Sequence, residues 1–102
     1  MTKRLMIDAA LVVKNVAVIR QSILDAFEEA DTITLDLVEG QAVDLCGLQL
    51  IESARRHARA VGKTLSLERP GTEFRTVLDA AGFLTEPSSD DLQFWLHQGT
   101  AQ

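Results

Sequence analysis

The sequence lacks the features that mark several large classes of protein. Its single cysteine, Cys46, cannot form a disulfide within the chain, so an oxidising compartment is not required. No apolar run approaches the length of about 20 residues that a transmembrane helix needs. Residues 1–8 have too few apolar side chains, and turn acidic too early, for a secretory signal peptide. These absences favour a cytoplasmic protein that inserts no segment into a membrane.

Basic residues are too few to suggest nucleic acid or an anionic membrane as the main partner. The chain has 15 acidic residues against 10 lysines and arginines, a net charge of −5 and a pI near 4.8. The basic residues Arg55, Arg56, Arg59 and Lys63 fall late in a predicted helix, where cations complement the helix dipole. We therefore expect no nucleic-acid partner.

Motifs of common catalytic and cofactor sites are also missing. The sequence contains no glycine-rich dinucleotide loop, no P-loop and no nucleophile elbow. His57 and His97 have no cysteine or carboxylate cluster at the spacing of metal ligands. Asp36, Glu39 and Asp44 could pair as an acid and a base, but nothing places a substrate cleft beside them. We therefore expect no enzyme, no catalytic residue, no metal and no cofactor.

The chain does have the composition of one ordinary globular domain. With 102 residues, of which 46% are hydrophobic and 25% charged, it can bury a core without metals or disulfides. We expect a single domain over residues 1–102, in which residues 85–102 form a C-terminal extension. Phe94 and Trp95 are expected to pack at the edge of the domain, and an exposed Phe94–Trp95 tail would allow a homodimer.

Alternating and helical hydrophobic patterns predict an α/β fold. Strands are expected at Arg4–Ile7, Ala9–Val13, Thr32–Val38 and Thr64–Glu68. Helices are expected at Val16–Ala30, from Asp44 to Val61 and from Thr72 to Ala81, with a short helix or turn at Leu92–His97. The order predicts a single mixed sheet of about four strands, parallel at its centre and flanked by three to four helices.

Polar residues and glycines mark the expected helix ends. Asn15 and Asp44 are predicted N-caps, and a carboxylate at such a position contributes about 1 kcal/mol. Gly62 and Gly82 are predicted to end the second and third helices. The second helix has an apolar stripe made of Leu48, Ile51, Ala54, Ala58 and Val61.

Six segments of the chain follow one another at a spacing typical of one family. They are Ile33–Leu37, Val43–Leu48, Ala54–Ala58, Gly62–Leu65, Phe74–Leu78 and Ala81–Phe83. In this order they resemble the STAS domain, named for sulphate transporters and anti-sigma-factor antagonists. The resemblance covers roughly residues 5–84, and it implies the α/β sheet described above.

The resemblance breaks at the position that family members use as a switch. In phosphorylatable members, the serine after the motif aspartate accepts phosphate from a partner kinase, and the added charge disrupts the complex. Here Asp44 matches the aspartate, and Leu45, which has no hydroxyl, stands at the serine position. Cys46 cannot carry this serine chemistry, and the nearest hydroxyl, Ser53, lies outside the motif. We therefore expect a variant that lacks the phosphoacceptor.

Cys46 allows two interpretations. A thiol near a helix N-terminus could be a nucleophile or a redox sensor. The candidate base, His57, lies about three helical turns away, roughly 16 Å at 1.5 Å per residue. A buried structural thiol is therefore favoured.

The predicted binding surface is the turn and helix of residues 44–56. A rotation of about 100° per residue places the following side chains outward or near the rim: Val43, Asp44, Leu45, Gln49, Glu52 and Arg56. Leu45 is either an apolar anchor for a partner or a core residue.

The resemblance implies a non-enzymatic bacterial signalling protein. Its partner would be a kinase-like anti-sigma factor or a chemotaxis-type kinase. The alternative is a STAS subunit that binds the ATPase of a bacterial lipid-transport ABC complex. A nucleotide-binding module is a third possibility, which rests on family analogy alone.

Overall fold

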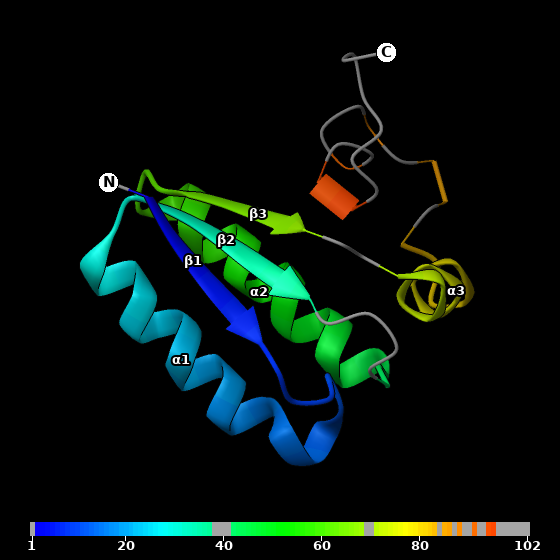
Figure 1. Ribbon diagram of the computed structural model, residues 1–102. Coiled ribbons are helices and arrows are strands. Elements are labelled where there is room, and N and C mark those ends of the chain that lie inside the picture. Colours follow the sequence, from blue (N-terminus) through cyan, green and yellow to red (C-terminus); the bar gives the residue numbers. More distant parts are fainter. Residues whose placement is uncertain are drawn as a thin grey trace.

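Three parallel strands join in sequence order to form the sheet (Figure 1). The computed structural model describes residues 2–37, 42–68 and 71–83, together with residues 85, 86, 88, 91, 94 and 95. The elements are β1 (Thr2–Ile7), the short 3-10 helix η1 (Val13–Asn15), α1 (Val16–Glu29), β2 (Thr32–Leu37), α2 (Leu45–Ala60), β3 (Thr64–Glu68) and α3 (Thr72–Ala80). The expected α/β fold with parallel central strands is confirmed.

The sheet differs from the expected one in two respects. The described residues contain three strands instead of about four, and all of them are parallel instead of mixed. The predicted strand at Ala9–Val13 is wrong, because only Leu11 pairs, in an isolated parallel bridge to Val43. After Leu11 the chain turns into η1 within two residues, which leaves no length for a strand.

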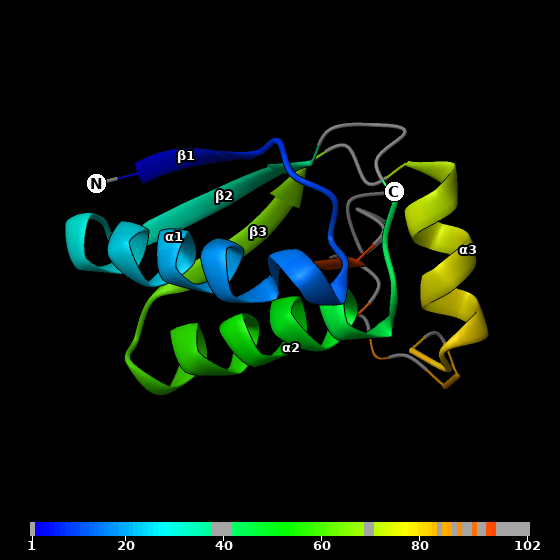
Figure 2. The same cartoon turned by 90° about the horizontal axis from the view of Figure 1, so that it is seen from below.

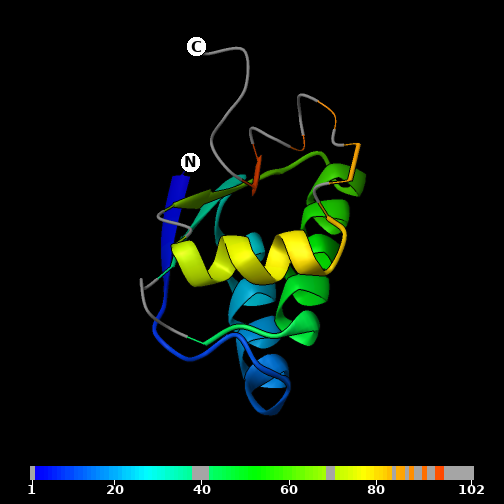
Figure 3. The same cartoon turned by 90° about the vertical axis from the view of Figure 1, so that its right-hand side faces the viewer.

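The helices lie in one layer and at one end of the sheet. Figure 2 shows α1 and α2 side by side on the same face of the sheet. Figure 3 shows α3 lying across the end at which the strands finish, in front of α1 and α2. The turn before α2 lies at this same end of the sheet, so the sheet and α1 position the first turn of α2.

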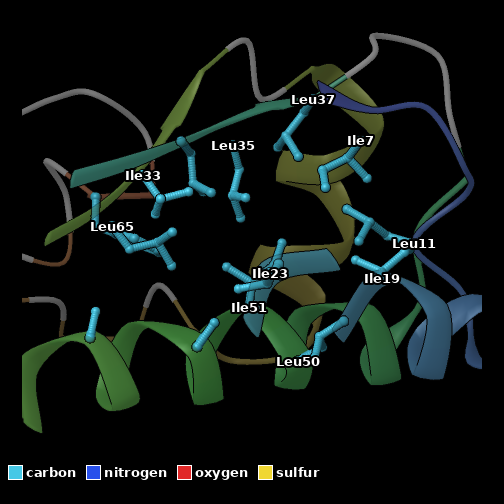
Figure 4. Packing of buried hydrophobic residues seen from close by; sticks show 14 of the residues in the cluster. Ile7, Leu11, Ile19, Ile23, Ile33, Leu35, Leu37, Leu50, Ile51 and Leu65 are labelled. Carbon is cyan, nitrogen blue, oxygen red and sulfur yellow. The ribbon is translucent and has the colours of Figure 1, made fainter. Parts of the chain in front are cut away.

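The core lies between the sheet and the two long helices. Ile33, Leu35 and Leu37 alternate along β2 and point toward Ile23 of α1 and Ile51 of α2 (Figure 4). All five side chains are buried. At about 25 cal/mol per Å² of apolar surface, this packing is the main stabilising contribution to the fold.

The opposite face of the sheet is mostly polar, with the exposed Met6 of β1 as an apolar exception. Arg4 of β1 reaches diagonally to Asp36, at 3.2 Å, and on to Glu68 of β3. Hydrogen bonds to Glu68 first, and to Asp36 second, raise the pKa of Arg4 above its ordinary value. Asp36 is only 2% exposed and needs this cation, because a buried carboxylate without a partner is costly.

The predicted side-chain cap of α1 is wrong, whereas the predicted ends of α2 and α3 are confirmed. Asn15 precedes α1, but its side chain does not cap the helix; its amide donates to the Ala10 carbonyl at 2.9 Å. Gly62 and Gly82 end α2 and α3 as expected, with φ of 74° and 86°. In both helices the next residue's N–H returns to a carbonyl of the last turn.

Val61, the last residue of the predicted apolar stripe of α2, and Ala81, the last residue of the predicted third helix, are not in the core. Val61 is 49% exposed, and Ala81 is also exposed. Each is the C-cap residue, so the chain leaves the helix there and no longer follows the helical periodicity.

Phe94 and Trp95 are both buried, which confirms their expected packing against the domain and leaves no exposed tail of these two residues. The Trp95 ring packs against the rings of Phe74 and Phe83, with centroid separations of 6.1 and 5.4 Å. The homodimer expected from exposed aromatics therefore loses its basis. The remainder of Leu92–His97, and Leu84, lie outside the described residues.

Candidate functional site

The turn before α2 is held by both oxygens of one carboxylate. Asp44 Oδ1 accepts the Gly47 N–H at 3.1 Å, which confirms the predicted N-cap. Its Oδ2 accepts the Val13 N–H at 3.0 Å. Asp44 therefore fastens the start of η1 to the start of α2, across 31 positions of sequence.

Backbone contacts strengthen the same junction. Leu11 N–H donates to the Ala42 carbonyl, and Asp44 N–H donates to the Leu11 carbonyl, both at 2.9 Å. Gly47 packs directly on this segment: a Cβ built there would lie 2.2 Å from the Leu11 carbonyl oxygen. The first turn of α2 can approach the η1 loop this closely only because position 47 has no side chain.

Two large apolar side chains remain exposed at this junction. Leu45 is 49% exposed and Val13 is 65% exposed. The structure thus places Leu45 outward, and Leu45 is not a core residue. Sequence reasoning missed Val13, because the contact that brings it beside α2 spans 31 positions and leaves no local signal.

The predicted binding residues continue from Leu45 along one side of α2, and we call this row, Leu45, Gln49, Glu52 and Arg56, the binding stripe. Gln49 is exposed, Glu52 is half-buried, and the Arg56 side chain is 76% exposed. Arg56 Nε donates to Glu52 Oε2 at 3.1 Å, a bond that joins residues one helical turn apart. Val43, the first residue of the predicted set, is half-buried against the core instead of lying at the surface.

An open depression runs beside this stripe, between α2 and the end of α3. Its volume is about 560 Å³. Its lining consists of Gln49, Glu52, Ser53, Arg56 and Phe83. Three of these five residues belong to the predicted binding set, so the stripe borders a concave surface.

Arg55 connects the other side of Glu52 to the C-terminal residues. Its side chain is 10% exposed, and Nη1 donates to Asp91 Oδ1 at 2.9 Å. The guanidinium lies 4.6 Å from the centroid of the Phe94 ring. A hydrogen bond from the Ser88 N–H, followed by that from Arg55, lowers the pKa of Asp91 against the opposing effect of burial.

The residues considered for catalysis are not assembled into a catalytic site. Cys46 is half-buried, and the His57 ring packs edge-on against Phe27 at 5.6 Å. Asp36 pairs with Arg4, while Asp44 caps α2, and Glu39 lies outside the described residues. Among the described residues, no three histidine, cysteine, aspartate or glutamate side chains gather as a metal site would require. In the same part of the chain, no helix has the length and apolar character needed to span a membrane.

The geometry defines a small parallel α/β domain whose second helix opens at an exposed, carboxylate-capped turn. Comparison with protein families matches residues 3–99 to the STAS domain. The chain therefore belongs to the STAS-domain family. No curated protein and no solved structure gave a significant match.

Family membership carries a general functional statement. STAS domains generally act in regulation through contacts with protein partners, and they are generally not enzymes. The surface formed by Leu45 and the stripe behind it is consistent with such a contact.

Proposed function

We propose that this protein is a non-enzymatic, cytoplasmic bacterial signalling protein that binds a kinase-like partner. The partner would be a kinase-like anti-sigma factor or a chemotaxis-type kinase, and the contact would be made by the turn and helix of residues 44–56. The observation that carries the proposal is the exposure of Leu45 at the position where phosphorylatable relatives have serine. An apolar side chain left in water at a helix start is a natural anchor for a partner.

Phosphorylation at the position used by relatives could not switch off binding at this surface. Leu45 has no hydroxyl to accept phosphate, so the charge that disrupts complexes of relatives cannot be added there. Polar groups would border the Leu45 anchor, in the arrangement of an apolar centre and a polar rim. They belong to Asp44, Gln49, Glu52 and Arg56.

The second candidate is a STAS subunit that binds the ATPase of a bacterial lipid-transport ABC complex. The same observation favours it, because an apolar anchor without a switch suits a subunit that stays bound. The two candidates differ in the class of partner and share the surface.

The test is a pull-down from native cell extract with wild-type protein, Leu45→Glu and a matched control, Val61→Glu. Val61 has the same exposure of 49% and lies at the opposite end of α2, so the control adds the same charge at an equally exposed apolar site. We expect one partner to be recovered by wild type and Val61→Glu, and lost with Leu45→Glu.

The identity of the recovered protein separates the candidates. A kinase-type protein supports the signalling function, and an ABC ATPase supports the transport function. Equal recovery by all three proteins would show that the partner binds elsewhere and would overturn the proposed surface.

A further inference from the structure

We propose that the partner's contact element is a helix that is apolar at one end and acidic at the other, lying along α2. This inference rests on the proposed function and adds the chemistry of the partner. It follows from how exposed charge and exposed apolar surface are distributed over the N-terminal and C-terminal halves of α2.

The N-terminal half of α2 supplies the apolar contact. Leu45 and Val13 are both exposed, and both flank Asp44, which binds the Val13 N–H and caps the helix. The apolar anchor is therefore a pair of side chains on a rigid junction. A rigid apolar pair loses little conformational entropy when a partner covers it.

The C-terminal half of the same helix is basic where it is exposed. Arg56 is 76% exposed and uses only Nε in its bond to Glu52. Arg59 is exposed and, within the described residues, makes no ion pair. The whole chain has a net charge of −5, so these exposed cations form a local positive region on a negatively charged protein. Such a region attracts an acidic group on the partner.

Distance and shape favour a helix as the acidic partner element. Leu45 and Arg56 are 11 positions apart on α2, which corresponds to roughly 16 Å at 1.5 Å per residue. A helix beside α2 spans that distance in about three turns. The depression of about 560 Å³ beside the stripe, which Phe83 also lines, has room for its side chains.

Other occupants fit less well. A second copy of the chain that packed through the same surface would place Arg56 and Arg59 either against the same cations or against its apolar end, and neither arrangement supplies the acidic group that they favour. The chain's own residues Asp91 and Phe94 are already held on the other side of Glu52, by Arg55. Nucleic acid would leave Leu45 and Val13 without an apolar contact.

The test measures binding of two alanine-based helical peptides to the full chain by fluorescence anisotropy. One peptide has leucines near one end and glutamates about 11 residues away. The other is identical but has lysines in place of the glutamates. We expect the glutamate peptide to bind about tenfold more tightly at low salt, and the difference to shrink as salt screens the charges.

Three variants and one control locate the contact. Arg56→Gln is expected to reduce the preference for the glutamate peptide, because Arg59 remains, and Arg56→Glu to remove it. Arg75→Glu makes the same charge change at an exposed position of α3 and is expected to leave the preference unchanged. Leu45→Glu is expected to weaken binding of both peptides.

The outcomes separate this inference from the proposed function. Equal binding of both peptides, still lost with Leu45→Glu, would overturn the acidic partner helix and leave the Leu45 surface intact. A preference for the glutamate peptide that survives Arg56→Glu would also overturn the inference. Binding of neither peptide would overturn it as well, whereas the proposed function depends on the pull-down alone.

Discussion

The first turn of α2 is held by residues from distant parts of the sequence, whereas its last turn is closed by its own neighbours. At the start, Leu11 and Val13 meet Asp44 and Gly47 through hydrogen bonds and close packing. At the end, Gly62 reverses the chain within the helix's own last turn. The end of α2 that carries the exposed Leu45 is therefore also the end whose shape depends on a distant segment of the chain.

The largest expected effect is at Gly47. In Gly47→Ala the new methyl group would lie 2.2 Å from the Leu11 carbonyl oxygen, so backbone must move. We expect the free energy of unfolding to fall by about 2–3 kcal/mol in urea titration. Ser53→Ala, an exposed position on the same helix, is the control and should change it by less than about 0.5 kcal/mol. A loss that small for Gly47→Ala would mean that the junction is loose.

Asp44 is expected to have the next largest effect. Asp44→Ala removes the cap and the acceptor for Val13, and we expect a loss of about 2 kcal/mol. Asp44→Asn keeps one acceptor oxygen and should lose about half as much. Amide hydrogen exchange at Val13 and Gly47 provides the local readout. Faster exchange at only one of the two amides would contradict a shared carboxylate.

At the other end of α2 the expected effect is smaller. Gly62 has φ of 74°, and no heavy atom lies within 4 Å of the position that a Cβ would take, so Gly62→Ala introduces backbone strain without a clash. We expect a loss of about 1 kcal/mol, and a smaller loss for Gly62→Asn, because asparagine tolerates this conformation better. If both Gly47→Ala and Gly62→Ala cost the same, the contrast between the two ends is not supported.

The smallest expected effect is a pH dependence from Asp91, which contacts Arg55 near the middle of α2. Its pKa is lowered in the folded chain, so its ionised form stabilises the fold. That contribution is complete above the ordinary pKa of 3.8 and is lost as the pH falls through the lowered folded value. We expect stability to fall below about pH 4, and this slope to be reduced in Asp91→Asn. Fluorescence of Trp95, the single tryptophan, reports the change locally; an unchanged slope would contradict the assignment.

Local patterns predicted most of the fold. Alternating apolar residues located two strands to within about one residue, at Thr32–Val38 and Thr64–Glu68. Glycines located the ends of α2 and α3, at Gly62 and Gly82. Each of these signals acts between near neighbours in sequence. The strand expected at Ala9–Val13 failed because its apolar residues serve a single bridge and a turn.

The candidate site was predicted only in part, for the same reason. Helical rotation placed Gln49 and Arg56 outward from the sequence alone, whereas for Leu45 the sequence left both an outward and a core position open. Val13 was missed, since it reaches Asp44 across 31 positions. The packing of Trp95 was predicted, but its ring partners were not, because they come from other parts of the chain, Phe74 among them. Neither contact has a periodicity that a sequence displays.

The order β1-β2-β3 means that each strand joins the sheet beside the strand made just before it. During synthesis on the ribosome, β1 and β2 can pair as soon as α1 has emerged between them, and no strand must wait for a later one to be inserted. The hydrogen bonds of the Asp44 junction involve only residues up to Gly47, so this junction can form before β3 leaves the ribosome.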